Sequence, residues 1–140
     1  MKIGLINQQK IKRVNLKQLH KFLKKVLVLL NITPGGLSIL LCDNTLIRKL
    51  NKKYLKKSGV TDVIAFSLTD DLEPDYLGEV IVSVEEADQS ARRLGFKWQD
   101  ELRLYLIHGI LHLVGYNDRT KLGKKRMDKE QMRILKSISK

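Results

Sequence analysis

The chain has 140 residues, of which 43% are hydrophobic and 30% charged, a composition typical of a soluble globular domain and not of a disordered chain. Its longest aliphatic run, residues 26–30, is far shorter than the roughly 20 residues that a membrane-spanning helix needs. The net charge of +12 favours an anionic partner such as nucleic acid, although a solvated lysine-rich surface accounts for it equally well.

Cysteine content and the N-terminus indicate a cellular compartment. Cys42 is the only cysteine, which excludes a disulfide framework and suits a reducing environment. It lies in the apolar run "LSILLC", so we expect it to be buried. The first residues lack the apolar segment and small-residue cleavage site of a signal peptide. We therefore expect a cytoplasmic protein that is neither secreted nor inserted in a membrane.

The N-terminal part of the chain predicts two strands around one helix. "KIGLIN" at 2–7 has the pattern of a strand, and apolar residues recur at helical spacing over 16–30. Asn15 is the expected N-cap of that helix. "TPGG" at 33–36 predicts a turn, and residues 37–42 predict the second strand.

The middle of the chain predicts a short helix followed by two more strands. Asp43 or Asn44 caps a helix that continues to about Tyr54, with inward-facing Leu46, Ile47 and Leu50. Strands are predicted at 60–66, from the β-branched run "VTDVIAF", and at 76–84. The acidic stretch 69–75 between them is expected to be a loop.

The C-terminal part predicts three helices, at 85–94 with Gly95 ending the first, at 98–114, and from Thr120 or Lys121 to about 138. Strands that alternate with helices indicate an α+β or α/β sandwich, in which helices cover a small sheet. At this length we expect a single domain over residues 1–140.

Two of the three histidines lie in the most apolar helix. Apolar residues surround the predicted helix 98–114, so it should be central and buried. His108 and His112 are four residues apart and therefore neighbours on one face. A divalent metal would satisfy one nitrogen of each ring; two separately hydrogen-bonded core histidines are the alternative.

Asp118 is the expected third ligand. Gly115 can adopt the left-handed conformation that ends a helix and turns the chain back toward the histidines. Two histidines and a carboxylate leave a fourth position open, as in a catalytic zinc site. The alternative roles for Asp118 are a turn residue or the N-cap of the last helix, whereas Asn117 is expected to shape the turn. Gly109 stands where zinc peptidases carry a general-base glutamate, so proteolysis is disfavoured.

The histidine segment resembles a known family. "HGILHLVGYND", residues 108–118, is similar to the signature His-Gly-x-Leu-His-Leu-x-Gly-Tyr-Asp-His of the YbeY family of rRNA-maturation endoribonucleases, matching seven of its nine fixed positions. "LNKKYLKKSGVTDVIAFSL" and "LGEVIVSVEEA" resemble two further blocks of the family, in the same order.

The resemblance implies a small mixed sheet packed against helices, one Zn²⁺ per chain and cleavage of single-stranded RNA. It also implies trimming of the 16S rRNA 3′ end and late ribosome quality control, with the small ribosomal subunit and assembly factors as partners. The implied metal ligands are His108, His112 and Asp118, with no membrane association. Neither the residues nor the resemblance identifies a catalytic group beyond the metal site.

Two departures from the family pattern bear on activity. Asp118 replaces a third histidine, which lowers the formal charge of a zinc site from +2 to +1. Leu55 replaces an arginine thought to serve activity, and leucine cannot hold a phosphate. Nearby cations are candidates to bind RNA in its place, unless they form only a solvated surface: Arg48, Lys52, Lys53, Lys56 and Lys57.

Three functions are therefore compatible with the sequence. The first is a zinc-dependent endoribonuclease. The second is a ribosome-assembly binding factor with weak or lost catalysis, motivated by Leu55 and Asp118. The third is a metal hydrolase that acts on a phosphoester other than RNA. Elsewhere, His20 is expected at a surface or boundary position, and Trp98 and Tyr105 in the core instead of on a base.

Overall fold

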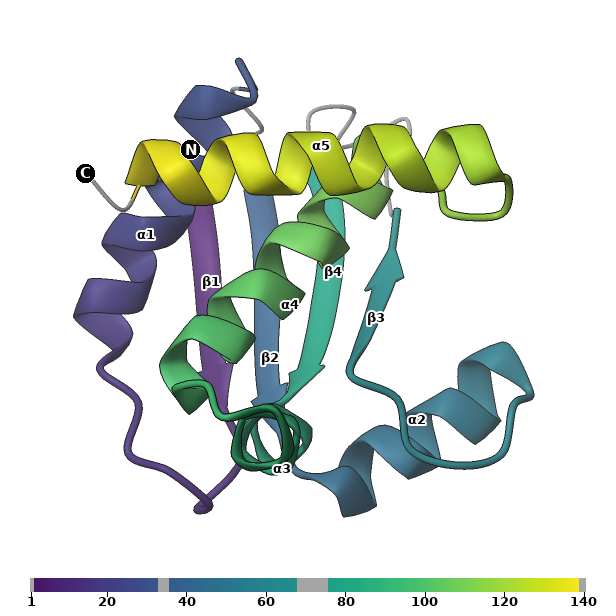
Figure 1. The fold of residues 1–140 in the computed structure, drawn as a ribbon. Helices are drawn as coiled ribbons and strands as arrows, with labels where there is room; N and C mark the ends of the chain where they lie inside the picture. Colours follow the sequence, from purple (N-terminus) through teal and green to yellow (C-terminus); the bar gives the residue numbers. More distant parts are fainter. Residues whose placement is uncertain (1, 33–35, 68–75, 139–140) are drawn as a thin grey trace.

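A computed structural model describes residues 2–32, 36–67 and 76–138 of the chain (Figure 1). Residues 33–35 of the predicted turn and the predicted acidic loop at 69–75 lie outside the described residues. The elements are β1 (Lys2–Asn7), α1 (Leu16–Leu29), β2 (Gly36–Cys42), α2 (Asn44–Leu55), β3 (Val63–Phe66), β4 (Tyr76–Ser83), α3 (Val84–Leu94), α4 (Trp98–Leu113) and α5 (Lys121–Ile138).

The four strands form one mixed sheet in the order β1-β2-β4-β3. β2 pairs in parallel with β1 and β4, whereas β3 runs antiparallel to β4. The parallel connections pass through helices, as they must, because parallel strands need a long crossover. The expected α+β architecture, with a small mixed sheet packed against helices, is confirmed.

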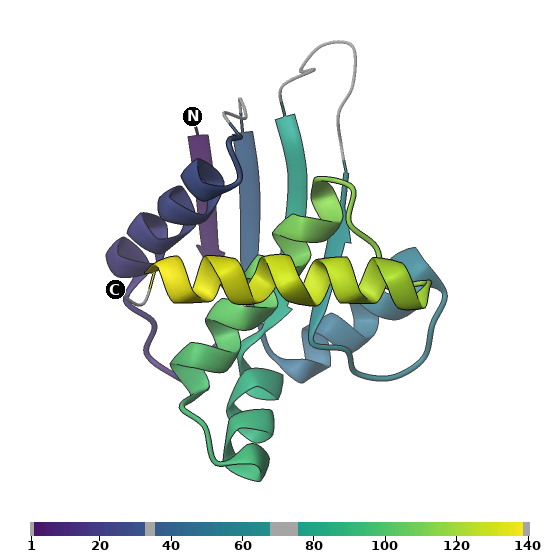
Figure 2. The same ribbon diagram turned by 45° about the horizontal axis from the view of Figure 1, so that its top comes forward.

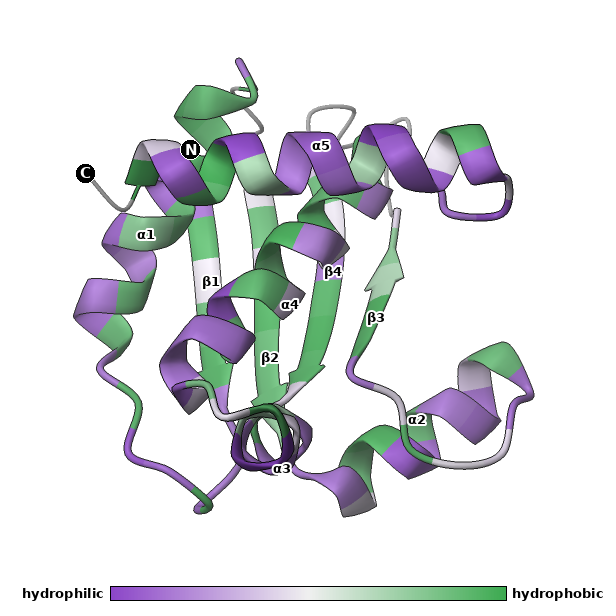
Figure 3. Cartoon of the chain, in the orientation of Figure 1, coloured by the Kyte–Doolittle hydropathy of each residue, from purple (hydrophilic) through white to green (hydrophobic). Residues whose placement is uncertain are grey.

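The alternating side chains of β2 divide the interior into two clusters. Leu37, Ile39 and Leu41 belong to the larger cluster, which also contains buried residues of α1, α4 and α5. Cys42 belongs to the smaller cluster, together with Ile47 of α2. Because successive side chains of a strand point to opposite faces, α2 packs against the face opposite α1, α4 and α5. Figure 2 shows α5 crossing in front of α4 and reaching α1, and Figure 3 shows the apolar strands behind these helices.

Local capping signals fixed the helix ends. Asn15 accepts a hydrogen bond from the Gln18 N–H, and Asp43 accepts one from the Leu46 N–H, as expected of N-caps. Gly95 ends α3 with φ of 78°, also as predicted. Of the residues expected to face inward on α2, Ile47 is fully buried, while Leu46 and Leu50 are half-buried.

Strand ends were predicted less well. Residues 60–62 were expected in β3, yet the strand begins at Val63. Its partner β4 ends at Ser83, whose hydroxyl accepts from the Glu86 N–H and caps α3. Pairing therefore starts at Val63 opposite Val82, and of residues 60–62 only Asp62 reaches β4, where its carbonyl accepts from the Ser83 N–H at 3.0 Å. Across the described part of the chain, no helix combines the length and hydropathy of a membrane span.

Candidate metal centre

α4 is the central helix, as predicted, and lies directly on β3 and β4. Its buried residues surround the axis and include Leu102, Leu106, Ile107 and Ile110. Gly109 faces the sheet so closely that an added Cβ would lie 2.7 Å from Val80 Cγ1 and 3.0 Å from Val63 Cγ2. The glycine between the two histidines thus lets the helix approach the sheet, while the histidines project from its half-exposed side.

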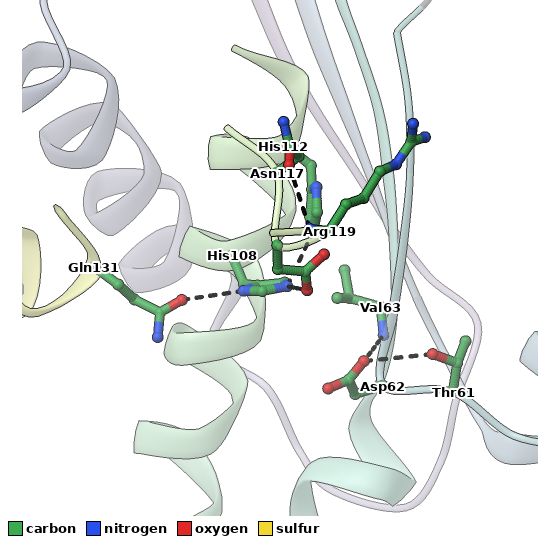
Figure 4. A network of polar contacts seen from close by, with 9 residues as sticks. Thr61, Asp62, Val63, His108, His112, Asn117, Arg119 and Gln131 are labelled. Atoms are coloured by element: carbon green, nitrogen blue, oxygen red, sulfur yellow. Dashed lines mark hydrogen bonds and ion pairs between the residues drawn. The ribbon is translucent and has the colours of Figure 1, made fainter. Parts of the chain in front are cut away.

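The two histidine rings of α4 point their Nε2 atoms at each other. The His108 and His112 Nε2 atoms are 3.1 Å apart, and the rings lie edge to face with centroids 4.6 Å apart. Figure 4 shows both rings beside the turn that follows α4. Neither ring is enclosed in the apolar core, because both side chains are half-buried. This arrangement does not match the alternative of two separately hydrogen-bonded core histidines.

The turn after α4 brings Asp118 to the histidines. Gly115 has φ of 105°, and the Tyr116 N–H donates to the carbonyl of Leu111, so the chain reverses within a few residues. The Asp118 Oδ2 lies 3.9 Å from His108 Nε2. Potential ligand atoms of His108, His112 and Asp118 all lie within 4.8 Å of one another, so the group can hold a metal ion.

Residues beside Asp118, and not Asp118 itself, shape the turn and cap α5. Thr120, not Asp118, caps α5, because its hydroxyl oxygen accepts from the Gly123 N–H at 2.9 Å. Asn117 shapes the turn as expected, accepting from the Arg119 N–H at 3.3 Å. The Asp118 carboxylate is half exposed, and the one basic side chain within 4 Å of it among the described residues is His108. It is thus available as a ligand.

Gln131 of α5 determines which nitrogen of His108 carries the proton. Its Oε1, an acceptor, lies 3.2 Å from His108 Nδ1, so Nδ1–H is the donor (Figure 4). The His108 Nε2 then presents a lone pair toward His112 and Asp118. An outer hydrogen bond of this kind is the usual support of a metal-bound histidine.

Electrostatics keep His112 neutral near pH 7. Burial lowers the pKa of His112 below its ordinary value of 6.5, and the neighbouring His108 lowers it further. Three other interactions raise the pKa of His112: the charge of Asp118, a hydrogen bond with the backbone of Tyr116, and the charge of Asp62. A neutral imidazole is the form that binds a metal. His112 is thus held in the form a ligand requires.

The donor set could hold a divalent metal such as zinc. Tetrahedral Zn²⁺ with bonds of about 2.0–2.1 Å separates its ligand atoms by about 3.3 Å. Two of the three separations, 3.1 Å and 3.9 Å, lie on either side of that value, and all three are within 4.8 Å. Two imidazoles and one carboxylate are also an ordinary zinc set with one position left open.

Gln131 and Asp62 lie at the site but were not among the predicted site residues. Gln131 lies 23 residues after His108, in an amphipathic helix with no motif, so nothing local signals its role. Asp62 precedes β3 and accepts from the Val63 N–H at 2.8 Å, with its carboxylate close enough to affect His112 (Figure 4). The only sequence feature that could have pointed to Asp62 was its position in the run "VTDVIAF", part of a block that resembles the family.

The candidate RNA-binding cations lie outside the ligand group. Arg48, Lys52, Lys53, Lys56 and Lys57 are all exposed, on α2 or directly after it. Leu55 is 41% exposed beside them. Lys56 ends α2 in the left-handed conformation, six residues before Asp62. The chain therefore links this cluster to the edge of the histidine site, although the cluster supplies no ligand.

The remaining single-residue predictions are largely confirmed. Cys42 is buried, and burial raises the pKa of its thiol to about 12. Tyr105 is buried in the core, and Trp98 is half-buried against it. His20 occupies a boundary position on α1.

Comparison with known proteins places the chain beside one family. A profile of the family described as Endoribonuclease YbeY matches residues 4–139. A protein named Endoribonuclease YbeY from Syntrophus aciditrophicus is 36% identical over 121 residues, covering 84% of this chain and 76% of its own. The protein of that name from Petrotoga mobilis is 40% identical over 120 residues, covering 84% and 80%.

A solved structure shares the fold. The solution structure of TM1509 from Thermotoga maritima superposes with a TM-score of 0.66 and 24% identity, covering 94% of this chain and 85% of that one. At that identity, the match supports the sheet and helix arrangement alone.

Proposed function

The chain belongs to the YbeY family of endoribonucleases, and we propose that it is a zinc-dependent enzyme that cleaves single-stranded RNA. We propose that residues 1–140 act as one domain in the cytoplasm. Its role would be maturation of the 16S rRNA 3′ end and late ribosome quality control, in contact with the small ribosomal subunit and its assembly factors.

The observation that carries the proposal is the convergence of three ligand atoms at the end of a buried helix. His108, His112 and Asp118 would hold one Zn²⁺ per chain. A zinc ion in such a site supplies Lewis acidity toward a phosphoryl oxygen and lowers the pKa of water. Gln131 would orient His108 by accepting its Nδ1–H.

The cations of α2 would hold the RNA backbone. Arg48, Lys52, Lys53, Lys56 and Lys57 are exposed, and the segment after α2 leads to Asp62 at the edge of the site. Lysines bind phosphate as point charges and not through a bidentate fork, so positioning here would depend on several weak contacts. Such contacts weaken as salt concentration rises.

A metal-reconstitution experiment tests the proposal. Wild type and His112→Ala are stripped with a chelator, supplied again with zinc, and assayed on a single-stranded RNA and on the same sequence as a duplex. We expect cleavage of the single strand by wild type only, lost on chelation and restored by zinc. His20→Ala, which removes a histidine outside the centre, should behave as wild type. Chelator-resistant cleavage by His112→Ala at the wild-type rate would reject the proposal.

A second candidate function is a ribosome-assembly factor whose catalysis is weak. It is favoured by Leu55, which presents an apolar side chain where the family carries an arginine, and by the lower charge that Asp118 gives the site. In that case His112→Ala still binds the small subunit and rescues growth of a deletion strain. Failure to rescue at normal abundance and folding would exclude a purely structural role.

A further inference from the structure

A basic groove lies on the opposite flank of α4 from the histidines. It has a volume of about 540 Å³ and is lined by α1, by Arg103 of α4 and by the last residue of α5. The lining residues are Asn15, Lys17, Gln18, Lys21, Phe22, Lys25, Arg103 and Ile138. Figure 1 shows α1 and α4 on the same side of the sheet, with the C-terminal end of α5 next to α1.

The cations of this groove have no counter-charge within the described residues. Lys17, Lys21 and Lys25 follow one another at four-residue spacing, and all three are exposed. None of them, nor Arg103, takes part in an ion pair there. Like charges four residues apart destabilise a helix, and α1 contains no acidic residue to offset them. An external anion would remove this repulsion.

The helix dipole and a ring contact reinforce the preference for an anion. Lys17 lies in the first turn of α1, where the helix dipole already favours negative charge. Arg103 is held over the ring of Phe22, with 5.5 Å between the guanidinium carbon and the ring centroid. The Phe22 ring is buried, so this contact fixes the guanidinium at the groove wall. The groove therefore presents one guanidinium held by a ring contact and three exposed ammonium groups.

We propose that this groove is a second RNA-backbone site, which binds a segment of the strand away from the cleavage point. The inference rests on RNA being the substrate, as argued above. Arg103 and His108 lie five residues apart on α4, about 7.5 Å along its axis and about 140° around it. A bound strand would thus follow α1 on one flank of α4 and reach the histidines on the other. The groove would contribute to RNA affinity without taking part in cleavage.

Charge-neutral variants of α1 test the site. Lys17→Gln, Lys21→Gln and Lys25→Gln together remove three exposed charges and leave Arg103 and the core untouched. Lys10→Gln, Arg93→Gln and Lys97→Gln remove three exposed charges outside the groove and serve as the matched control. Affinity for a fluorescent single-stranded RNA is measured by anisotropy across a salt series, with chelator present to keep the strand intact.

The groove variant should bind RNA at least about tenfold more weakly than the control at low salt. The plot of log affinity against log salt concentration should become shallower by about 2 for this variant. Each phosphate contact on a single strand contributes about 0.7 to the steepness, and three contacts are removed. At saturating RNA its cleavage rate should equal that of wild type, with only KM raised. Equal affinity and slope for the two triple variants would overturn the site. An inactive wild type would overturn the proposed function instead, and the binding comparison would still report on the groove.

Discussion

At the scale of single residues, the centre depends on side chains whose orientation is fixed from outside it. Gln131 sets the tautomer of His108, and burial keeps His112 neutral. Asp118 is different, because it is half exposed and held by the turn around Gly115 instead of by packing. Its contribution should therefore come from its charge and its position as a ligand.

Asp118→Ala should remove one of three ligands while leaving the fold intact. Loss of even an outer-shell partner weakens metal binding by about 10–100-fold, and a direct ligand should matter at least as much. Elemental analysis of protein purified without added metal should give one zinc per chain for wild type and far less for the variant. Asp128→Ala, which removes an exposed carboxylate of α5, is the control. Equal zinc content in all three proteins would show that Asp118 is not a ligand.

Gln131→Leu should weaken zinc binding without removing a ligand. The leucine cannot accept the His108 Nδ1–H, so the ring loses its fixed tautomer, and affinity should fall by about 10–100-fold. Gln131→Glu keeps an acceptor at the same distance and should retain wild-type affinity or exceed it. Competition with a chromophoric chelator measures both. Loss of affinity in both variants alike would point to packing of α5, not to the hydrogen bond.

At the scale of elements, the decisive contact is α4 against β3 and β4. The helix brings its histidines close to the strand edge because Gly109 has no side chain. Zinc peptidases carry a general-base glutamate at the position that follows the first histidine, whereas here Gly109 occupies the position between the two candidate ligands. The glycine serves the packing of the helix and contributes no chemistry.

Gly109→Ala should destabilise the protein, although the same change in an open helix stabilises it by about 0.5–1 kcal/mol. The added methyl would overlap Val80 and Val63, and overpacking of this kind costs about 1–3 kcal/mol. Urea unfolding of the metal-free protein measures the difference. Adding Val80→Ala to the variant should restore part of the loss. An increase in stability from Gly109→Ala alone would show that the helix has room to move.

The sequence predicted best what is encoded locally. The helix caps at Asn15 and Asp43 and the stop at Gly95 depend on a few adjacent residues, and they are confirmed. The start of β3 depends on where β4 ends, so periodicity placed it three residues too early. Gln131 approaches His108 only through the crossing of α5 over α4. A contact of that kind leaves no pattern in a single sequence.

At the scale of the whole molecule, positive charge is distributed over two separate surfaces. The lysines of α1 line a groove on one side of the sheet, whereas those of α2 lie on a helix that packs against the other. The two sets can thus contact different parts of one long strand. A net charge of +12 also favours rapid, salt-sensitive association with any polyanion.

The stability of the metal-free protein should fall as pH drops below 6.5. In the folded state burial and His108 lower the pKa of His112 below 6.5, whereas the unfolded ring titrates at its ordinary value of about 6.5. The unfolded state therefore binds more protons in this range, so stability is complete above pH 6.5 and is lost as pH falls through the folded pKa.

Urea midpoints with chelator present, at about pH 7.5 and about pH 5.5, measure the loss. His112→Gln should abolish this part of the dependence, while His20→Gln should keep it. If His112→Gln retains the full wild-type dependence, another group carries the titration, and burial of the neutral His112 ring does not set the pH dependence of stability.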